Sequence, residues 1–455
     1  MKTFLQVALL AVALTASGRD ASAQDTRQVA EPMIPPACTI LLAQLSSRGK
    51  GLADSDENYP DTERIQKAID ACPAGHAVEL RAKGEFNAFL SGPLQLRTGV
   101  TLLVDLNTVL FGSRNPRDYD VSPGSCGVID EKGHGCKALI SGEDANDAGV
   151  MGEGAIDGRG GAKLLGQNVS WWDLAQEAKV KKAYQNCPRL IMLVHCNNFT
   201  LYQVTLRNPG NYHVFFSNGN GFTAWGVKIN TPRTARNTDG IDPASSTNVT
   251  ITHCYIHTGD DQVAIKANTG GPSSHMTIAH NHFYTGHGMS IGSETEGGVS
   301  AIRVSDLSID GADNGLRIKS NSSRGGQVSD VVYQDVCIRN TKNPILMDSN
   351  YPYPGGARNK FPSFTGIVLR NVRILGGGKL SLQGFDAAHR LQITLDDVSA
   401  DGLSAARVTA THAQVTLGPG PVNFRPSGDD VQVTGTPGAS APASCRDKFV
   451  PMPAH

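Results

Sequence analysis

Four short motifs between Asn237 and Lys319 hold residue types that can carry out acid–base chemistry on a sugar. The motifs are Asn237-Thr238-Asp239, Gly259-Asp260-Asp261, Gly286-His287-Gly288 and Arg317-Ile318-Lys319. Cleavage of a glycosidic bond by water needs one protonated carboxyl group, which donates to the leaving oxygen, and one ionised carboxylate, which activates the water. Neighbouring carboxylates do not all ionise, so a cluster of three is expected to retain a proton. The two cations would suit a substrate that carries its own carboxylate.

Each motif also has a purely structural explanation. Asp in a Gly-rich turn often serves to form that turn, His287 could cap or pack, and Arg317 and Lys319 could lie on a solvated strand edge. The occurrence of all four motifs in one chain favours the catalytic interpretation. Asp242, which precedes a proline, is expected to be structural, and His213 could line a cleft but receives no role.

The motifs recur at about the same intervals as a set of short apolar strands. The central apolar residues of one set, separated by 24, 26, 27 and 28 residues, are Ile241, Ile265, Ile291, Ile318 and Leu346. A second set lies at residues 249–251, 276–278, 302–304, 331–333 and 367–369. A unit of this length with two or three strands and no long helix is typical of one coil of a parallel β-helix. A propeller blade would need four hairpin-linked strands, for which these intervals are too short.

This repeat predicts where the motifs meet. Equivalent positions on successive coils stack about 4.8 Å apart, so motifs next to the aligned apolar residues should share one face. If Ile318 points into the apolar interior, Arg317 and Lys319 both point outward. We therefore expect a cleft that combines three carboxylates with two cations. Asparagines that suit sharp corners support the same fold; they are Asn237, Asn248, Asn281, Asn314 and Asn371.

Two helices are expected beside the strands. From Asp61 to Cys72 apolar residues recur at helical spacing behind an Asp cap, and such a helix would close the open end of the coil. Short strands are expected at residues 77–80, 100–104, 138–141 and 149–151. The stretch from Trp171 to Ala183 carries three lysines and is expected to be a solvated amphipathic insertion. These lysines are Lys179, Lys181 and Lys182.

The start of the chain resembles an export signal. Lys2 precedes an apolar run from Phe4 to Leu14, and Ala21-Ser22-Ala23 forms a cleavage site before Gln24. The run is too short to span a bilayer, although a buried N-terminal helix is an alternative. We expect residues 1–23 to be a signal peptide, 24–455 to be a single β-helix domain with a loosely packed tail at 435–455, and the protein to be secreted, extracellular via the periplasm.

Composition limits the partners. The formal net charge is −1 and the sequence pI is about 6.9, so no global basic field draws in nucleic acid or an anionic membrane. An anionic ligand must therefore be held locally. Glycine, at 50 of 455 residues, exceeds its usual share of about 7% and indicates many tight turns.

Nine cysteines are compatible with an oxidising compartment. Cys126 and Cys136 flank a Gly-rich loop and could pair, and Cys38 could pair with Cys72. Three others lie in apolar strand-like runs and are expected to be buried and free; they are Cys196, Cys254 and Cys337. No Cys or His spacing indicates a zinc site.

The ordered motifs resemble glycoside hydrolase family 28, the polygalacturonases, and the longer runs resemble the bacterial endopolygalacturonases. Those runs are Asn237 to Pro243 (NTDGIDP), Gly259 to Lys266 (GDDQVAIK), Gly286 to Glu294 (GHGMSIGSE) and Gly315 to Ser320 (GLRIKS). The similarity covers most of the chain after residue 23. A lone Asp-Asp would be weak, whereas four motifs in this order are specific.

The resemblance implies a right-handed parallel β-helix that hydrolyses 1,4-α-galacturonosidic bonds in polygalacturonate, with inversion and without a metal or cofactor. We also expect the protein to act as a monomer. Carried over by position, Asp260 would be the general acid, Asp239 and Asp261 would position and deprotonate the water, and His287 would tune the acid. Substrate would be bound by Arg317, Lys319, Asn237 and Tyr351, with Tyr353 as a nearby alternative to Tyr351. Ala235-Arg236 departs from the common Ser-Pro before Asn237 and adds a cation that could affect subsite preference.

Other readings remain open. An exo-acting polygalacturonase or a rhamnogalacturonan hydrolase would share the fold and the acid pair. A pectate lyase uses a β-helix on the same polymer but needs Ca²⁺ and an Arg base. A tailspike-like adhesin would bind polysaccharide without cleaving it. The Arg/Lys pair favours galacturonate at the cleaved bond, and the predicted single domain favours endo action.

Overall fold

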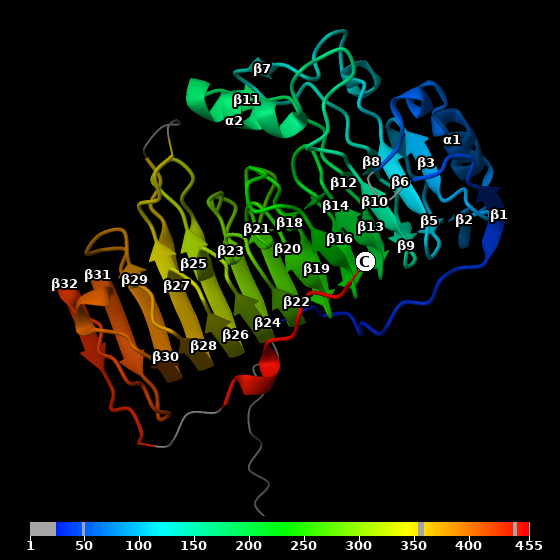
Figure 1. Ribbon diagram of the computed structural model, residues 1–455. Helices are drawn as coiled ribbons and strands as arrows, with labels where there is room; N and C mark the ends of the chain where they lie inside the picture. Colours follow the sequence, from blue (N-terminus) through cyan, green and yellow to red (C-terminus); the bar gives the residue numbers. More distant parts are fainter. Residues whose placement is uncertain (1–23, 48–50, 354–358, 440–443, 455) are drawn as a thin grey trace, which may run out of the picture.

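The chain winds into coils whose strands stack in parallel. The computed structural model describes residues 24–47, 51–353, 359–439 and 444–454. One continuous sheet contains 30 strands, and β7 (Ile129–Asp130) pairs separately with β11 (Tyr184–Gln185) in antiparallel fashion. Figure 1 shows the coils stacked from β1 (Ala37–Leu42) at one end to β32 (Gly428–Thr434) at the other. The predicted right-handed parallel β-helix is confirmed.

The strands form three ladders along the coil axis. The first ladder comprises β4 (Leu94–Gln95), β8 (Ile140–Glu143), β12 (Ile191–Val194), β15 (Val214–Ser217), β18 (Ile241–Ala244), β21 (Val263–Ile265), β23 (Met289–Ile291), β25 (Asn314–Lys319), β27 (Asn343–Asp348) and β29 (Leu380–Gln383). The second comprises β1, β2 (His76–Arg81), β5 (Val100–Val104), β9 (Gly149–Met151), β13 (Asn197–Tyr202), β16 (Asn220–Trp225), β19 (Thr247–Thr252), β22 (Ser273–Phe283), β24 (Val299–Asp310), β26 (Gln327–Arg339), β28 (Ser363–Leu375), β30 (Leu391–Ala400), β31 (Val408–Leu417) and β32. The third comprises β3 (Ala88–Ser91), β6 (Val109–Gly112), β10 (Ala155–Asp157), β14 (Thr205–Arg207), β17 (Lys228–Asn230) and β20 (Tyr255–His257), and is continued by the C-terminal part of β22.

The interior of the coil is filled by stacked apolar side chains. In the first ladder Ile265 pairs with Ile291, and Ile291 pairs with Ile318, and all three are fully buried. Every second residue of a strand points inward, so the residues between them face outward. This alternation places Arg317 and Lys319 on the outer face, as predicted.

The predicted register is wrong at both ends of the set that runs from Ile241 to Leu346. Ile241 pairs with Val263 and not with Ile265, and Ile318 pairs with Met347 and not with Leu346. Apolar spacing does not reveal how many residues a turn consumes, and a slip of one residue reverses the face to which a side chain points. The second ladder has the predicted register throughout, from Val249–Met276 to Tyr333–Leu369.

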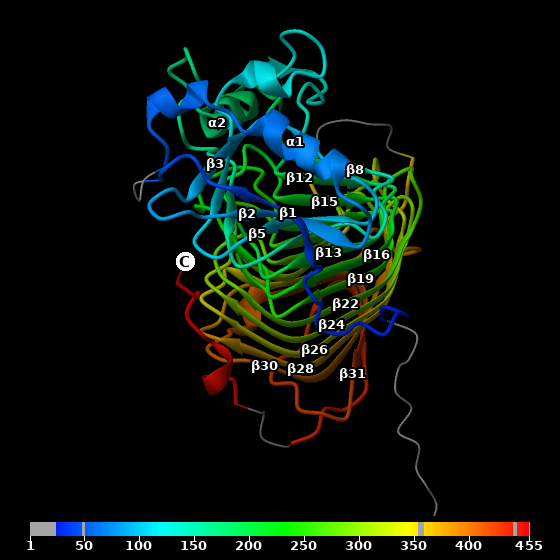
Figure 2. The same cartoon turned by 90° about the vertical axis from the view of Figure 1, so that its right-hand side faces the viewer.

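Helix α1 (Thr62–Ala71) covers one end of the coil, as expected, and Figure 2 shows it across that end. Ile65 and Ile69 are fully buried against the first coils. Asp61 precedes the helix but does not cap it with its side chain. It instead accepts hydrogen bonds from Arg64 and from the backbone N–H of Leu90, which ties the helix start to β3.

Helix α2 (Trp171–Lys181) departs from the expected solvated insertion. Trp171 is fully buried and Ala175 and Ala178 are buried beside it, so one side of the helix packs on the coil. Ser170 accepts a hydrogen bond from the Asp173 backbone at the helix start. The periodicity predicted the helix, but only the packing shows that it is fixed against the coil.

Three disulfides are present among the nine cysteines, all of which the structure describes. The predicted pairs Cys38–Cys72 and Cys126–Cys136 are confirmed. Cys196 and Cys254 are free and buried as predicted, together with Cys187. The prediction for Cys337 is wrong, because it is bonded to Cys445 across 108 residues of sequence.

This third disulfide fixes the tail that the sequence predicted to be loosely packed. Lys448 lies 2.5 Å from Asp306, and the Tyr284 hydroxyl donates to the Val450 carbonyl over 3.1 Å. The described residues 444–454 therefore run back along the coil. The predicted signal peptide at residues 1–23 lies outside the described residues. Within the described part of the chain, the helices fall short of the length and apolar character that crossing a bilayer requires.

Candidate active site

The motifs meet on the outer face of the first ladder. Four successive coils of this ladder each deliver one motif to the same face, in the turn before the strand or on the strand itself. The order is Asp239 before β18, Asp260 and Asp261 before β21, His287 before β23, and Arg317 and Lys319 on β25. The stacked arrangement predicted from the repeat is therefore present.

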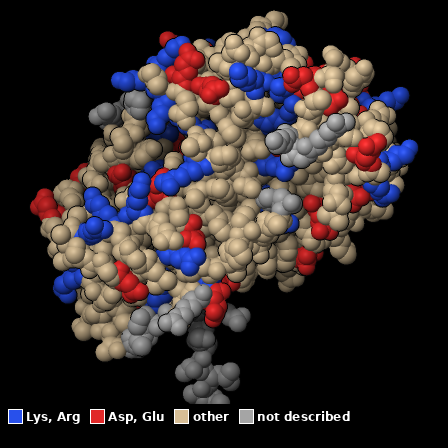
Figure 3. Space-filling model, viewed as in Figure 1, with Lys and Arg blue, Asp and Glu red and all other residues tan. Residues whose placement is uncertain are grey.

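Four of these residues border a polar cleft of about 700 Å³, namely Asp260, His287, Arg317 and Lys319. Asp239 and Asp261 are buried next to it. Helix α2 contributes Gln176 and Lys179 to one side, so the expected solvated insertion forms part of the cleft wall. Two carboxylates, Asp260 and Asp313, line the cleft beside six cations. These cations are Lys179, Arg233, Arg236, Arg317, Lys319 and Lys342. Figure 3 shows Lys and Arg side chains gathered below α2 on this face. The cleft suits an anionic ligand even though the whole chain is nearly neutral.

Asp261 binds the two predicted substrate cations. Its Oδ2 atom accepts from Lys319 Nζ over 2.7 Å, and its Oδ1 atom accepts from Ser290 Oγ over 2.7 Å and from Arg317 Nη1 over 3.3 Å. Burial opposes ionisation of Asp261, but Lys319 and Arg317 outweigh it, and the pKa of Asp261 lies below its usual range. Asp261 is thus an ionised anchor, and both its oxygens are engaged.

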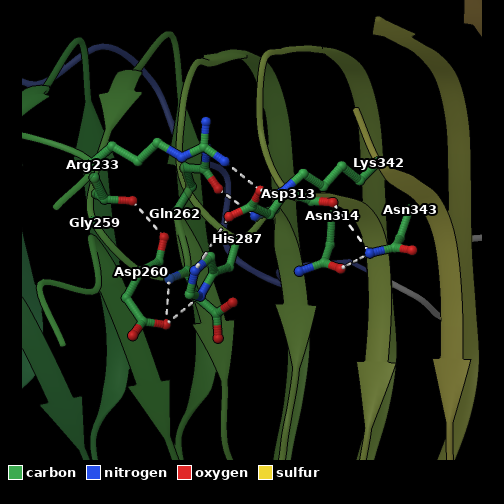
Figure 4. Close-up of polar contacts among 12 residues, drawn as sticks. Arg233, Gly259, Asp260, Gln262, His287, Asp313, Asn314, Lys342 and Asn343 are labelled. Atoms are coloured by element: carbon green, nitrogen blue, oxygen red, sulfur yellow. Dashed lines mark hydrogen bonds and ion pairs between the residues drawn. The ribbon is translucent and has the colours of Figure 1, made fainter. Parts of the chain in front are cut away.

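Asp260 is paired with His287. The Nδ1 atom of His287 lies 2.9 Å from Asp260 Oδ1, and Figure 4 shows the two side chains facing each other. Burial raises the pKa of Asp260, but the hydrogen bond and charge of His287, helped by Lys319 and Lys266, reverse this effect and hold it below its usual range. Burial lowers the pKa of His287, and Asp260 more than compensates, so that the pKa of His287 is raised.

Asp239 is buried beneath this pair. Its Oδ2 atom lies 3.6 Å from Lys266 Nζ, and its Oδ1 atom is without a hydrogen-bond partner among the described residues. Burial raises the pKa of Asp239 well above its usual range, the charges of Asp242 and Asp260 add to the increase, and Lys266 opposes it. Which of the three carboxylates retains the proton was left open by the sequence. Asp239 has the higher proton affinity, because Asp260 has a cationic partner of its own.

His213 supports Asp239 from below and does not line the cleft. It is fully buried, with Nδ1 2.9 Å from the Asp239 carbonyl oxygen and Nε2 2.8 Å from Thr231 Oγ1. Burial lowers the pKa of His213 to about 4. His213 therefore stays neutral and holds the turn that carries Asp239.

The two remaining predicted substrate contacts, Asn237 and Tyr351, line the cleft together with Arg317 and Lys319. Asn237 adopts the left-handed backbone (φ 56°) expected for a corner and accepts from Gln185 over 3.1 Å. The Tyr351 ring lies 5.4 Å from both Arg317 and Lys319. Tyr353 instead stacks on Arg324 and bonds to Tyr184, so of these two tyrosines it is Tyr351 that lies in the cleft lining. The cation of Arg236, noted as a departure from the family pattern, bonds to the Ala175 carbonyl of α2 and to Gln185.

The same corner prediction succeeds for some asparagines and fails for others. Asn248 and Asn371 have positive φ, like Asn237. Asn281 instead lies within β22 and uses its side chain to bond the backbone of Ile251 and Cys254. Asn314 begins β25. Asparagine therefore marks a left-handed corner at three of the five predicted positions, and at Asn281 it stabilises the backbone of a neighbouring strand through its side chain.

Sequence reasoning missed a second group of charged residues, which surrounds Asp313 next to His287. Asp313 lies 3.8 Å from His287 Nε2, 2.5 Å from Arg233 and 3.4 Å from Lys342, as Figure 4 shows. Lys266 was missed as well. Asp242, for which a structural role was expected, is fully buried and lies 3.2 Å from Lys266. The alternation that identified Arg317 and Lys319 also places Asp242 and Lys266 outward, and this signal could have found them.

Asp260, Asp261 and His287 bring metal-ligand atoms within 4.8 Å of one another. These atoms already bind one another or neighbouring cations, since Asp261 is held by Arg317 and Lys319. Two adjacent cations disfavour a third positive charge at this position. The donor set fits acid–base chemistry better than metal binding.

The comparisons with known proteins agree with this geometry. The family Glycosyl hydrolases family 28 matches residues 87–417. An endo-polygalacturonase of Pectobacterium carotovorum subsp. carotovorum is 46% identical, over 83% of this chain and 90% of its own, and a polygalacturonase of Ralstonia nicotianae is 41% identical over 98% and 97%. The solved structure of the polygalacturonase from Erwinia carotovora ssp. carotovora superposes with a TM-score of 0.75 at 41% identity, covering 91% of this chain and 99% of that one. With its acid–base cluster in place on a matching β-helix, the chain belongs to glycoside hydrolase family 28 and is a glycoside hydrolase.

Proposed function

We propose that this enzyme hydrolyses 1,4-α-D-galacturonosidic linkages within polygalacturonate and de-esterified pectin, in endo fashion and with inversion. The observation that carries the proposal is the pair of cations on the cleft floor. Arg317 and Lys319 lie beside the Asp260/Asp261 turn, with little exposure of their own. A uronate at the cleaved bond would supply the carboxylate that such a pair binds.

The rest of the cleft supports a polymeric anionic substrate. Cations extend from Lys179 on α2 to Lys342 before β27, beyond the turn that carries Asp260. A chain with a carboxylate on each sugar could contact several of them at once. The relatives of Pectobacterium and Ralstonia are named polygalacturonases, and the name endo-polygalacturonase of the former supports the endo mode.

The acid step follows from the His287–Asp260 pair. A bound uronate neutralises Arg317 and Lys319, and its negative charge raises the proton affinity of Asp260. The proton then moves from His287 Nδ1 to Asp260 Oδ1 along their hydrogen bond. Asp260 donates it to the glycosidic oxygen as the bond from that oxygen to the anomeric carbon breaks.

Asp239 is the base that activates the attacking water. Its Oδ1 atom is unpartnered among the described side chains and is available to accept from a water, whereas both oxygens of Asp261 are engaged. Asp239 takes a proton as the water oxygen bonds to the anomeric carbon on the side opposite the leaving group. A raised pKa makes Asp239 a stronger base once it is ionised. Asp261 keeps the substrate cations in place.

The proposal includes where the enzyme acts. The N-terminal pattern at residues 1–23 supports secretion, and three disulfides support an oxidising, extracellular destination reached through the periplasm. We propose a monomer that needs neither a metal nor a cofactor, and whose partner is its polysaccharide substrate.

The time course of products from polygalacturonate tests the function. A ladder of oligomers at early times is expected, whereas monomer or dimer alone would establish exo action. Proton NMR of the first product is expected to show the β-anomer, and the α-anomer would refute inversion. Chelator is expected to leave the rate unchanged.

Three outcomes would establish a different function. An unsaturated, ultraviolet-absorbing product would establish a lyase, and release of reducing ends only from rhamnogalacturonan would establish a rhamnogalacturonan hydrolase. Binding of polysaccharide without new reducing ends would establish an adhesin.

A further inference from the structure

Behind the catalytic turn lies a buried cluster of one cation and two carboxylates, of which the steps above use only Asp239. Lys266 Nζ lies 3.2 Å from Asp242 Oδ2 and 3.6 Å from Asp239 Oδ2. The Asp242 side chain is fully buried, and 6% of the Asp239 side chain and 13% of the Lys266 side chain are exposed. A single ammonium group is therefore shared by two carboxyl groups away from bulk water.

The strands dictate this sharing. Ile241 on β18 and Ile265 on β21 point into the apolar interior, so the residues after them, Asp242 and Lys266, point to the outer face. Lys266 follows β21 and forms a bridge with Ala244 at the end of β18, which brings its side chain beside Asp242. The ring of Tyr212 lies 5.5 Å from the ammonium group and covers it.

Three of the four carboxylate oxygens of Asp239 and Asp242 lack a hydrogen-bond partner among the described residues. Both oxygens of Asp242 and Oδ1 of Asp239 make no hydrogen bond to any residue that the structure describes. An ionised carboxylate buried without hydrogen bonds is costly, so the pair favours holding one proton. In agreement, burial raises the pKa of Asp242 to about 6 against the opposing charge of Lys266, and the carboxylates hold the pKa of Lys266 above its usual value despite burial.

We propose that Lys266 is a positioning residue whose ammonium group, shared between Asp239 and Asp242, decides the protonation state in which Asp239 meets the attacking water. The inference rests on the role of Asp239 as the base in the proposed function. Lys266 favours the ionised Asp239 that the reaction needs. Asp242 competes for the same ammonium group and repels the Asp239 charge, which keeps Asp239 a strong base.

The other charged groups around the cluster have partners of their own. Those near Asp239 or Lys266 are Asp242, Asp260, Asp261, Glu294 and Tyr212, and Arg189 lies 5.3 Å from the centre of the Tyr212 ring. Asp260 is paired with His287, Asp261 with Arg317 and Lys319, and Glu294 with Arg324 at 2.8 Å. Lys266 also lowers the pKa of Asp260 and of Glu294, but each of these carboxylates keeps its own cationic partner. Changes at Lys266 or Asp242 should therefore act most strongly on Asp239, whose ion-pair partner among the described residues is Lys266.

Two substitutions make opposite predictions. Lys266→Met removes the cation, so Asp239 should ionise only at higher pH, and Asp242→Asn removes the competing carboxylate, so Asp239 should ionise at lower pH. The acidic limb of kcat/KM on polygalacturonate reports this ionisation in the free enzyme. We expect it to move up by about one pH unit in Lys266→Met and down by about one pH unit in Asp242→Asn. The substrate carboxylate titrates equally in all variants and cancels.

Two further variants separate this role from a structural one. Lys266→Arg keeps the charge and should retain the wild-type limb. The double variant Lys266→Met/Asp242→Asn removes one charge of each sign, so it should fold even where Lys266→Met does not, with its limb near that of the wild type. Both single variants moving the limb in the same direction, or the limb staying in place while only kcat falls, would overturn the inference. Wild-type enzyme that releases no reducing ends from polygalacturonate would instead overturn the proposed function.

Discussion

His287 Nδ1 lies 2.9 Å from Asp260 Oδ1, and this contact gives the acid of the proposed reaction a cationic partner in the free enzyme. An isolated pair of buried carboxylates would compete for one proton. Here the histidine lowers the proton affinity of Asp260, so the carboxylate with the higher affinity is Asp239. Substrate binding must therefore prepare the acid, and its negative charge can do so because it neutralises the cations that hold Asp260 ionised.

Replacing Asp260 with Asn should remove the proton donor while preserving the turn. General acid catalysis contributes about 10²- to 10⁴-fold, so kcat should fall by roughly a thousandfold. Release of reducing ends from polygalacturonate measures this loss, and circular dichroism should match that of the wild type. A variant that keeps more than a tenth of its activity would contradict the assignment.

Activity should decline as the pH rises through the raised pKa of His287, which lies above its usual 6.5. Above that pH the histidine is neutral and no longer supplies the proton that Asp260 donates. His287→Gln should lower kcat roughly tenfold or more at pH 5 and flatten the alkaline limb. A wild-type rate that stays constant well above pH 8 would count against this role.

The same pair should make stability depend on pH within a defined window. The pKa of His287 is raised in the folded state, so its contribution is complete below about pH 6.5 and is lost as the pH rises through the folded value. The pKa of Asp260 is depressed from 3.8, so its contribution is present above that pH and is lost as the pH falls through the folded value. The difference in Tm between wild type and His287→Gln should therefore be largest between about pH 4 and 6.5. An equal difference at pH 9 would show that the contact acts only through packing.

Arg317→Gln should weaken substrate use in proportion to the free carboxylates of the substrate. A charge-assisted hydrogen bond contributes about 2 kcal/mol, which corresponds to roughly 30-fold in kcat/KM. The loss should shrink on pectins of increasing methyl esterification, because an ester has no charge to bind. Lys67→Gln on the exposed side of α1 removes a cation outside the cleft and serves as the control. A constant loss across the esterification series would place the effect on Asp261 instead.

Replacing Cys337 and Cys445 with Ser should lower the free energy of unfolding by about 2–4 kcal/mol, since the disulfide closes a long stretch of chain. The sequence separation of this pair is 108, whereas that of Cys126 and Cys136 is 10, so the matched Ser variant of the shorter loop should lose less in the chain-entropy account. Thermal unfolding measures both losses. Neither pair lies in the cleft lining, and kcat/KM at 25 °C should be unchanged. A large drop in kcat/KM would show that the tail orders the cleft.

Much of the site could be predicted because the fold is a repeat. Residues that are one period of 24 to 28 residues apart stack on successive coils, so the sequence places Asp239, Asp260 and His287 on one face. The same reasoning failed at Ile241 and Leu346, where turns of different length shift the register. It also failed for Cys337, whose partner lies outside the repeat.

By itself, the sequence determined the coil, the outward direction of Arg317 and Lys319, and the family, because strand alternation and motif order are local properties of the chain. Only the tertiary structure decided which carboxylate has the higher proton affinity. That outcome depends on which charge stands next to each carboxylate: His287 beside Asp260, Lys319 beside Asp261, and a shared Lys266 beside Asp239. The proton affinity of a carboxyl group depends on its burial and on distances of a few ångströms to charges on other coils. The order of residues along the chain gives neither the burial nor these distances.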